Sequence, residues 1–210
     1  MTEARGGLSR DRIVRAAVDI IERDGAEAVS MRRLAAELNV GTMSLYNHVP
    51  NKAALLDGVA DFVMADMELA ADPEASWQDQ ARGLAHRLRA IARRYPRTVV
   101  VVITRQPRSG IGLHPVDIAL GATRRAGFDG RVAVRLVRTF VSFVLGSLMH
   151  EAGADAGEAA SYQAALADSL DRDRFTHVVA LLPELTELDP DGDFEFGLEL
   201  LITAMEAMPR

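Results

Sequence analysis

The sequence predicts an all-α protein. Apolar residues recur at helical spacing along almost the whole chain, and no segment shows the strict alternation of a half-buried strand. Serine or asparagine, whose side chains cap helices, stands just before several of these apolar patterns. Because only 5% of the residues are aromatic while 49% are hydrophobic, the core must be mainly aliphatic. We expect about nine or ten helices in all.

Four helices are expected in the first third of the chain. Ser9 can cap the first helix, and Gly25 can end it. Ser30 can cap the second helix, a tight turn separates the second from the third, and Asn51 can cap the long fourth helix. The expected ranges are 10–24, 31–38, 42–49 and 52–69.

Six further helices are expected in the rest of the chain. Ser76 can cap the first of them, and a loop is expected at residues 105–113. Residues 153–170 are small and polar and are expected to be part helix and part loop, whereas Pro183 is expected to break or kink a short helix. The expected ranges are 77–94, 99–103, 115–126, 129–152, 173–182 and 194–208.

Composition excludes several classes of protein. The chain has no cysteine, which excludes disulfide scaffolds, thiolate zinc sites, iron–sulfur clusters and cysteine nucleophiles. No run of about 18 consecutive apolar residues occurs, and no charged-then-apolar leader opens the chain. We therefore expect neither a membrane partner nor a secretory signal, and we expect the protein to work in the cytoplasm.

Charge is distributed unevenly along the chain, whose net charge is −6. Residues 82–138 carry 13 basic and 2 acidic side chains, whereas residues 139–210 carry 3 basic and 14 acidic ones. Residues 1–52 carry 8 basic and 7 acidic side chains. Most of these charges are expected on solvated helix faces. Only one of the 24 basic residues is a lysine, Lys52, and it stands at the start of the predicted fourth helix.

Two short predicted helices and the turn between them, within residues 30–52, have the spacing of a helix-turn-helix. Five apolar residues can point inward and hold the motif together: Leu34, Leu38, Val40, Leu45 and Val49. The second helix of such a motif enters the major groove of DNA. The sequence therefore predicts DNA binding.

The exposed side of the predicted recognition helix carries side chains that suit the edges of bases. Asn47 can bond adenine with two hydrogen bonds, and the hydroxyls of Thr42 and Ser44 can donate or accept. Met43 can touch a thymine methyl group, although it could also simply be exposed.

Other polar residues around this helix are candidates for contacts with the phosphate backbone, which sets register rather than sequence. Lys52 lies at a predicted helix N-terminus, so its ammonium group and the positive helix end would act on the same phosphate. Tyr46 could instead mainly pack against its neighbours. The phosphate candidates are Ser30, Arg32, Tyr46, His48 and Lys52.

Three segments, residues 13–17, 30–35 and 40–56, resemble the DNA-binding domain of the tetracycline-repressor (TetR) family. The similarity extends without a gap over residues 9–60, and the run Leu-Tyr-x-His-Val followed by Asn-Lys-x-x-Leu-Leu is hard to obtain by chance. The resemblance implies an N-terminal three-helix, helix-turn-helix DNA-binding domain at 9–56. The helix at 52–69 would join it to a larger helical effector-binding and dimerisation domain at 74–208. It implies DNA contacts from Ser30, Arg32, Thr42, Met43, Ser44, Tyr46, Asn47, His48 and Lys52.

Shorter pieces later in the chain resemble, in order, the ligand-binding half of TetR. They are residues 76–78, 94–95, 104–107, 145–150 and 196–198. The resemblance implies a homodimer formed through two late helices, here 129–152 and 194–208. The apolar pattern agrees, because these helices have more apolar surface than one chain can easily hide, and a symmetric four-helix interface would bury it.

The chain departs from the tetracycline repressor at one position that binds the drug. That repressor uses a histidine just before its Thr-Arg-Pro loop to ligate a drug-bound magnesium ion, but residues 98–104 contain no histidine. We therefore assign no metal ligand and no cofactor, and we expect a mostly apolar effector. Glu68 and Arg105 are the candidate polar anchors, and each apolar candidate could equally be a plain core residue. The effector candidates are Glu68, Leu84, Leu88, Val102, Arg105, Val137, Phe140 and Val141.

Together with these observations, the resemblance to the TetR family implies a ligand-responsive transcriptional repressor; repression rather than activation follows from the resemblance alone. As a homodimer, it would bind a roughly palindromic double-stranded DNA operator, and a small effector would release it. The helix at 52–69 is the only direct connector between the two predicted domains, so it would transmit the change.

Two other classes of protein stay open. An enzyme is disfavoured, because the sequence has no Gly-rich phosphate loop, no His-Glu-x-x-His and no Gly-x-Ser-x-Gly in a suitable context, and we assign no catalytic residue. The alternative is a helical small-molecule-binding or scaffold protein with degenerate DNA binding, because DNA affinity depends largely on neutralising phosphates and residues 1–52 carry little net positive charge.

Overall fold

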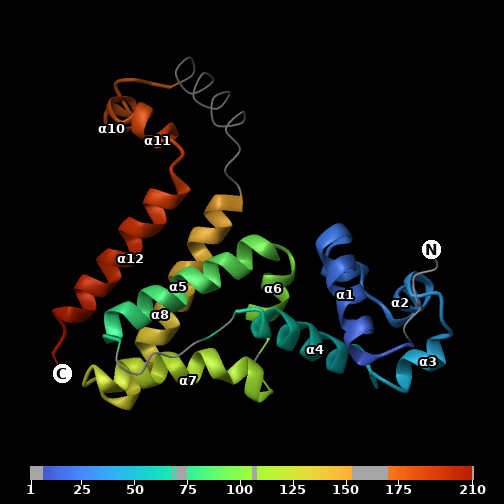
Figure 1. Cartoon of the computed structure of the whole chain (residues 1–210). Coiled ribbons are helices and arrows are strands. Elements are labelled where there is room, and N and C mark those ends of the chain that lie inside the picture. The colour runs from blue at the N-terminus through green and yellow to red at the C-terminus, as the bar shows by residue number, and fades with distance from the viewer. Residues whose placement is uncertain (1–6, 68, 70–74, 106–107, 153–169, 210) are drawn as a thin grey trace, which may run out of the picture. The chain divides into compact units, whose positions relative to one another are not determined.

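The computed structural model describes residues 7–67, 69, 75–105, 108–152 and 170–209. These residues form eleven α-helices and one short 3-10 helix, without a strand among them (Figure 1). The predicted all-α class is confirmed. The helices are α1 (Arg10–Asp24), η1 (Ala26–Ala28), α2 (Met31–Glu37), α3 (Thr42–Tyr46), α4 (Lys52–Ala65), α5 (Trp77–Arg94), α6 (Thr98–Ile103), α7 (Gly110–Arg125), α8 (Gly130–Ala152), α10 (Thr176–Ala180), α11 (Leu182–Thr186) and α12 (Pro190–Glu206).

The predicted N-caps are confirmed. Ser9, Ser30, Asn51 and Ser76 each accept a hydrogen bond from the backbone N–H three residues further on, at 2.8–3.2 Å. Each bond satisfies one of the N–H groups that the first turn of a helix leaves free. Gly25 ends α1 as expected, at a φ of 88° that L-residues with side chains rarely adopt.

Two predicted helices in the first half end earlier than expected. α3 stops at Tyr46 instead of near Val49, and a tighter turn follows, in which the backbone N–H of His48 bonds to the carbonyl of Leu45 three residues earlier at 2.9 Å. α4 ends at Ala65 and not at residue 69, and a turn follows it.

The later helix boundaries also differ from prediction where local caps decide them. α7 begins at Gly110, inside the expected loop, because Ser109 Oγ accepts a hydrogen bond from Gly112 N at 3.0 Å, and Pro115 lies within the helix. The helix expected at 173–182 is two short helices, α10 and α11, with Pro183 in the first turn of the second. Residues 153–169, expected to be part helix and part loop, lie outside the described residues.

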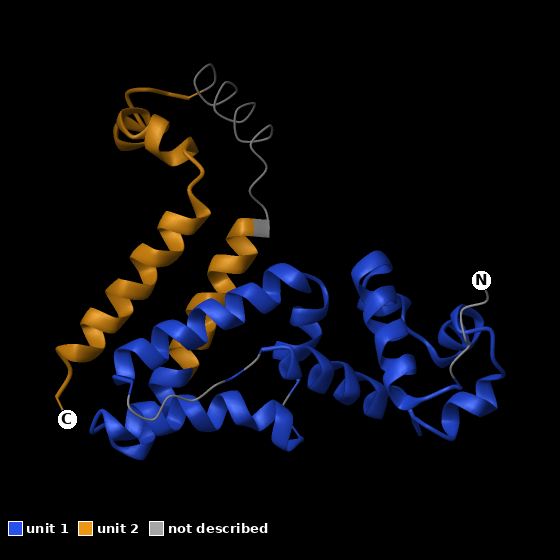
Figure 2. Cartoon of the chain, viewed as in Figure 1, with its two compact units in different colours: residues 1–137, 210 blue, residues 138–209 orange. Residues whose placement is uncertain are grey.

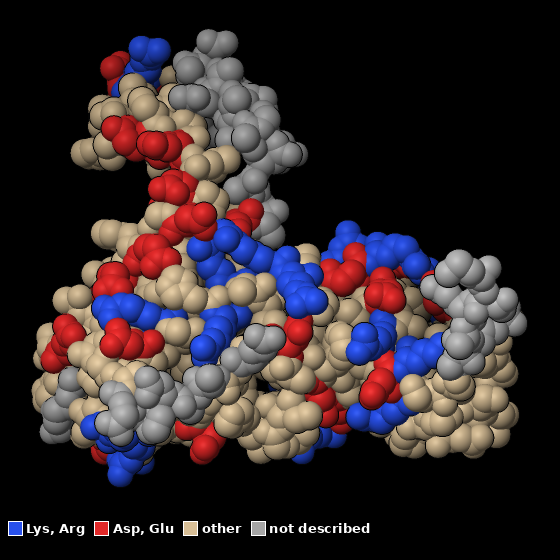
Figure 3. Space-filling view, viewed as in Figure 1, with Lys and Arg blue, Asp and Glu red and all other residues tan. Residues whose placement is uncertain are grey.

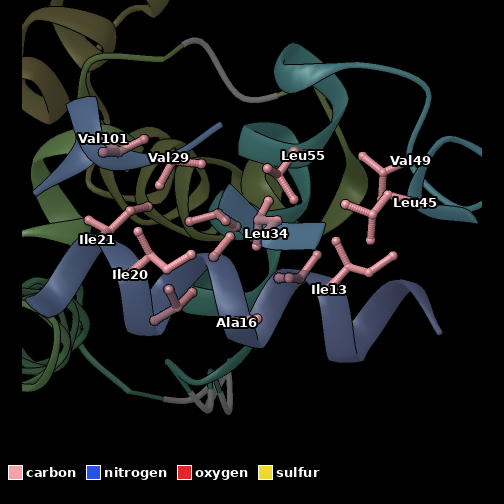
Figure 4. Close-up of a cluster of buried hydrophobic side chains, with 14 of the residues drawn as sticks. Ile13, Ala16, Ile20, Ile21, Val29, Leu34, Leu45, Val49, Leu55 and Val101 are labelled. Carbon is pink, nitrogen blue, oxygen red and sulfur yellow. The ribbon is translucent and has the colours of Figure 1, made fainter. Parts of the chain in front are cut away.

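The first core joins α1, α2, α3 and α4 around aliphatic side chains (Figure 4). Leu34, Leu45 and Val49, three of the five residues predicted to point inward, are buried in it, and Leu38 and Val40 are half-buried against it. Val101 of α6 also belongs to this cluster. The helix-turn-helix core therefore includes a residue that follows it by about 50 positions in the sequence.

The chain divides into two compact units, residues 1–137 with 210 and residues 138–209 (Figure 2). In the second unit, the rings of Phe143 and Phe194 stack with their centroids 5.7 Å apart, which joins α8 to α12. Gly197 is required beside them, since a Cβ there would lie 2.3 Å from the Phe143 ring. The two units divide the chain by packing, so the functional domains expected at 9–56 and 74–208 stay a prediction.

α12 carries apolar side chains on two opposite faces. One face is buried and consists of Phe194, Leu198, Ile202 and Met205. The other face presents Phe196 and Leu200, whose exposed fractions are 73% and 59%. Acidic side chains lie between the two faces, and acidic residues gather over α12 in the space-filling view (Figure 3).

α8 also keeps much of its apolar surface exposed. Val134 and Val141, seven residues apart on one face, are exposed, and Met149 is 76% exposed. By length and composition alone, Gly130–Glu151 is long and apolar enough to cross a membrane. No such segment is expected from the sequence, because Arg135 and Arg138 interrupt the apolar run. One helix of this kind is weak evidence for a membrane span, since core helices of soluble proteins share its length and composition.

Candidate DNA-binding site

The turn between α2 and α3 has the geometry that a helix-turn-helix needs. Asn39 adopts a φ of 54°, and asparagine tolerates this left-handed conformation better than most residues. The backbone N–H of Val40 then bonds to the carbonyl of Ala35 at 2.9 Å, which closes the C-terminus of α2. The turn thus fixes the orientation of α3 relative to α2.

Ion pairs hold α2 against α1 on the outer side of the motif. Arg23 donates to both carboxylate oxygens of Glu37 at 3.2 and 3.1 Å, and Arg33 donates to Asp24 at 2.5 Å. The hydrogen bond from Arg23, followed by its positive charge, lowers the pKa of the Glu37 carboxyl below its ordinary value. The neighbouring residue Arg32 is exposed, as a phosphate contact requires.

The shifted pKa of Glu37 gives the stability of the folded chain a defined pH dependence. Because the folded-state pKa lies below the unfolded-state value of about 4.5, the contribution is complete above that pH and is lost as the pH falls through the folded-state value. Wild type should therefore melt at a higher temperature than Glu37→Gln at pH 7, and the difference should vanish in stronger acid. Thermal unfolding followed by circular dichroism measures both. A difference that stays constant down to pH 2 would contradict the role given to this carboxylate.

The candidate base-reading residues lie on the solvent side of α3 and its C-terminus. Met43 is 77% exposed, Ser44 and Asn47 are exposed, and Thr42 is half-buried. Leu45, on the other side of the same helix, is completely buried. The structure therefore brings the four candidates to one accessible surface, although Asn47 is the C-cap of α3 and not a residue within it.

The candidate phosphate contacts surround this surface. Tyr46 is 41% exposed, and His48 is exposed. Ser30 is exposed at the N-cap of α2, and Lys52 is exposed at the first position of α4. The hydroxyl of Ser30 accepts the capping bond and can still donate its hydrogen to a phosphate oxygen.

Three of the candidate effector residues are brought together in the first unit. Leu84 and Leu88 of α5 and Val102 of α6 pack in one apolar cluster with Val63 of α4 and with Met67 in the turn after it. These residues are therefore in contact with the connecting helix, as an effector site that acts on it would require.

The remaining effector candidates are less closely connected. Val137 is half-buried on α8, whereas Phe140 and Val141, also on α8, belong to the second compact unit. Glu68 lies outside the described residues. Arg105 does not enter the apolar cluster; it donates hydrogen bonds to Asp57 of α4.

Sequence reasoning missed Glu22 and Asp57, which join α1 and α4 to the segment around α6. Glu22 accepts hydrogen bonds from the backbone of α6, and Asp57 accepts them from Arg105. The sequence predicts that the helix at 52–69 is the only direct connector to the helix-turn-helix. The structure shows a second connection, because α6 also contacts α1. No local pattern signals a contact between residues 76 positions apart.

Metal binding has no obvious location in the described part of the chain. No group of three or more histidine, cysteine, aspartate or glutamate side chains there is placed to hold an ion.

Comparison with known proteins places this geometry in a family. Residues 13–59 match the family described as bacterial regulatory proteins, tetR family, and residues 69–209 match the tetracyclin repressor-like C-terminal domain. The chain belongs to the TetR family. The expectation drawn from the sequence motifs is therefore confirmed, including a C-terminal half of the tetracycline-repressor type.

Several TetR-family relatives cover nearly the whole chain. The HTH-type transcriptional repressor DrrR1 of Streptomyces coeruleorubidus is 30% identical over 96% of this chain and 78% of its own. The class A tetracycline repressor of Escherichia coli is 29% identical over 94% of this chain and 90% of its own. Among solved structures, apo ActR of Streptomyces coelicolor is 31% identical over 97% of each chain, with a TM-score of 0.83.

Proposed function

We propose that this TetR-family protein is a homodimeric transcriptional repressor that binds a palindromic DNA operator and is released by a small, mostly apolar effector. The observation that carries the proposal is the helix-turn-helix surface, where Met43, Ser44 and Asn47 are exposed beside the buried Leu45. Short polar side chains on the open side of a recognition helix can read base edges in the major groove. Relatives that are named as repressors support repression rather than activation.

The exposed apolar faces of α8 and α12 support a dimer. Phe196 and Leu200 of α12 and Val141 and Met149 of α8 present large apolar surfaces to solvent in the single chain. A second copy of the same two helices would cover them in a four-helix interface. Such an interface has twofold symmetry, which is the commonest symmetry of homo-oligomers. In such a dimer, the acidic C-terminal block of residues 139–210 would lie away from the DNA.

A small-molecule effector is supported by a solved relative. ActR, which is 30% identical and has a TM-score of 0.83, has been crystallised in complex with actinorhodin. In this chain the apolar cluster of Leu84, Leu88 and Val102 lies against α4. A ligand that enters there would act on the helix that leads to the recognition helix. We propose no catalytic step, and we place the protein in the cytoplasm, where its DNA would be.

The direct test is a mobility shift of the purified protein on the DNA upstream of its own gene, at two salt concentrations. The proposal predicts a retarded band that resists competitor DNA and weakens as salt rises, because phosphate contacts release counterions. Binding that is absent even at low salt, on this DNA and on duplexes selected from a random pool, would favour the helical binding or scaffold protein with degenerate DNA binding.

Two substitutions should affect DNA binding in different ways. Asn47→Ala should lower the preference for the operator over mismatched duplexes by about 1–3 kcal/mol, because a base contact is lost. Lys52→Ala should weaken binding to all sequences alike and reduce the salt slope by about 1, because a phosphate contact is lost. Titrations on operator and scrambled duplexes at several salt concentrations measure both. Each variant serves as the control for the other, and unchanged affinity in Lys52→Ala would show that the phosphate assignment is wrong.

A further inference from the structure

α6 is a helix that gains little stability from its own sequence. Its six residues, Thr98–Ile103, are all β-branched, and such side chains lose rotamer freedom in a helix. The side chain of its N-cap residue, Arg97, does not bond the first turn. α6 must therefore be held in place largely by contacts with other elements.

The N-terminal end of α6 is bound by a carboxylate from α1. Glu22 Oε1 accepts a hydrogen bond from the backbone N–H of Thr98 at 2.7 Å, and its Oε2 accepts one from the backbone N–H of Arg97 at 3.3 Å. The guanidinium of Arg97 donates in return to the backbone carbonyl of Arg23 at 2.8 Å. A carboxylate at this end satisfies free N–H groups and meets the positive end of the helix dipole. Glu22 thus replaces the missing local cap.

The C-terminal end of α6 is bound by a second carboxylate, from α4. Arg105, just beyond the C-cap Thr104, donates to Asp57 Oδ1 through Nη2 at 2.6 Å and through Nε at 3.2 Å. The same guanidinium reaches the backbone carbonyl of Ala53 at 3.3 Å. One turn further along α4, Asp61 accepts a hydrogen bond from Ser109. The ion pair of Arg105 and Asp57 is largely shielded from solvent, since only 25% and 29% of the two side chains are exposed.

The middle of α6 packs into the DNA-binding core. Val101 lies in the same cluster as Ile21, Val29 and Leu55, as the labelled side chains in Figure 4 show. α6 is therefore held at three points, of which two are carboxylates from two different helices of the helix-turn-helix half.

We propose that Glu22 and Asp57 are positioning residues that fasten the two ends of α6 to the DNA-binding half and so fix the orientation of the recognition helix. The DNA readout of this inference rests on the proposed function. A change in the shape of α6 would reach α1 through Glu22 and α4 through Asp57. The signal from the C-terminal half would then have two routes to the helix-turn-helix, instead of the single connecting helix α4.

Whether DNA affinity rises or falls when Glu22 or Asp57 is neutralised distinguishes a positioning role from a purely electrostatic effect on the DNA phosphates. Removing a negative charge from the DNA-binding half should strengthen the attraction to phosphates if the charge is all that matters. Removing a positioning carboxylate should weaken specific binding, because the two recognition helices of a dimer are then no longer held at the spacing of the half-sites.

The experiment compares Glu22→Gln and Asp57→Asn with the control Glu27→Gln in the full-length protein. All three remove one negative charge and keep the size of the side chain, and Glu27 is exposed on η1. The first readout is amide hydrogen exchange of residues 98–104, which needs no DNA. The second readout is affinity for the duplex that wild type enriches from a random pool. Circular dichroism confirms that each variant is folded.

The expected result is exchange in α6 at least about tenfold faster in Glu22→Gln and Asp57→Asn than in wild type. Affinity for the enriched duplex should fall about 5- to 150-fold in these two variants, while Glu27→Gln should bind as wild type does or slightly more tightly. Unchanged exchange would overturn the fastening of α6. If α6 exchanges faster in Glu22→Gln and Asp57→Asn, but these variants bind DNA as tightly as Glu27→Gln does, the positioning role is overturned. If wild type enriches no duplex, the proposed function fails, and the exchange rates still decide whether the carboxylates hold α6.

Discussion

A Leu45→Ala variant should lose DNA binding together with about 2–5 kcal/mol of unfolding free energy. Leu45 is completely buried between the recognition helix and the rest of the helix-turn-helix core. Truncation would remove its apolar contacts and leave a cavity that the surrounding helices can fill only in part. α3 would then no longer be held in one orientation, so its exposed side chains could not meet the bases.

Met43→Ala is the matched control for this prediction, because the two residues lie two positions apart on the same helix and Met43 is 77% exposed. Its unfolding free energy should stay within about 0.5 kcal/mol of wild type. Urea unfolding followed by circular dichroism, with mobility shifts on the same samples, measures both properties. Equal stability loss in the two variants would mean that α3 does not pack as described.

The double variant Phe196→Glu/Leu200→Glu should convert the proposed dimer to a monomer and abolish operator binding. Fully burying a side chain such as Phe or Leu contributes about 1.5–3 kcal/mol, and a symmetric interface would hold two copies of each. Glutamates at these positions would bring four charges into the same interface. We expect the dissociation constant of the dimer to rise at least about a thousandfold. Operator affinity should fall because a single recognition helix contacts only one half-site.

Leu185→Glu is the control, because it places the same charge at an exposed leucine of α11, outside the two helices assigned to the interface. Sedimentation equilibrium and light scattering give the oligomeric state over a range of concentrations. The fold should survive in the double variant, since both substituted side chains are exposed in the single chain. A double variant that stays dimeric would show that α12 does not form the interface.

Sequence reasoning predicted best the features that are decided locally. The caps at Ser9, Ser30 and Asn51 depend on a side chain and an N–H three residues further on, so a short pattern contains the whole interaction. The alternation of buried Leu45 and exposed Met43 likewise follows from helical spacing. The resemblance to the TetR family rests on residues 9–60, the segment that contains these caps and the helix-turn-helix.

The features that sequence reasoning missed depend on contacts between distant parts of the chain. Glu22 reads as an ordinary charged residue of an amphipathic helix, and only folding brings it to the backbone of α6. Arg105 stays a predicted polar anchor for the effector, but its hydrogen bond to Asp57, 48 positions away, is a contact that no local pattern signals. The early start of α7 was missed because Pro115 suggested a helix start, whereas Ser109 caps the helix one and a half turns before it.

Selection of duplexes from a random pool by the purified wild-type protein tests the central claim most directly, since it needs no knowledge of the regulated gene. The account predicts an enriched palindrome whose half-sites lie about 34–36 Å, or a multiple of this distance, apart. Binding to this palindrome should weaken with salt, and its sequence preference should be lower in Asn47→Ala than in wild type. A pool that gains no common sequence after repeated rounds, with wild type folded and dimeric, would contradict the account.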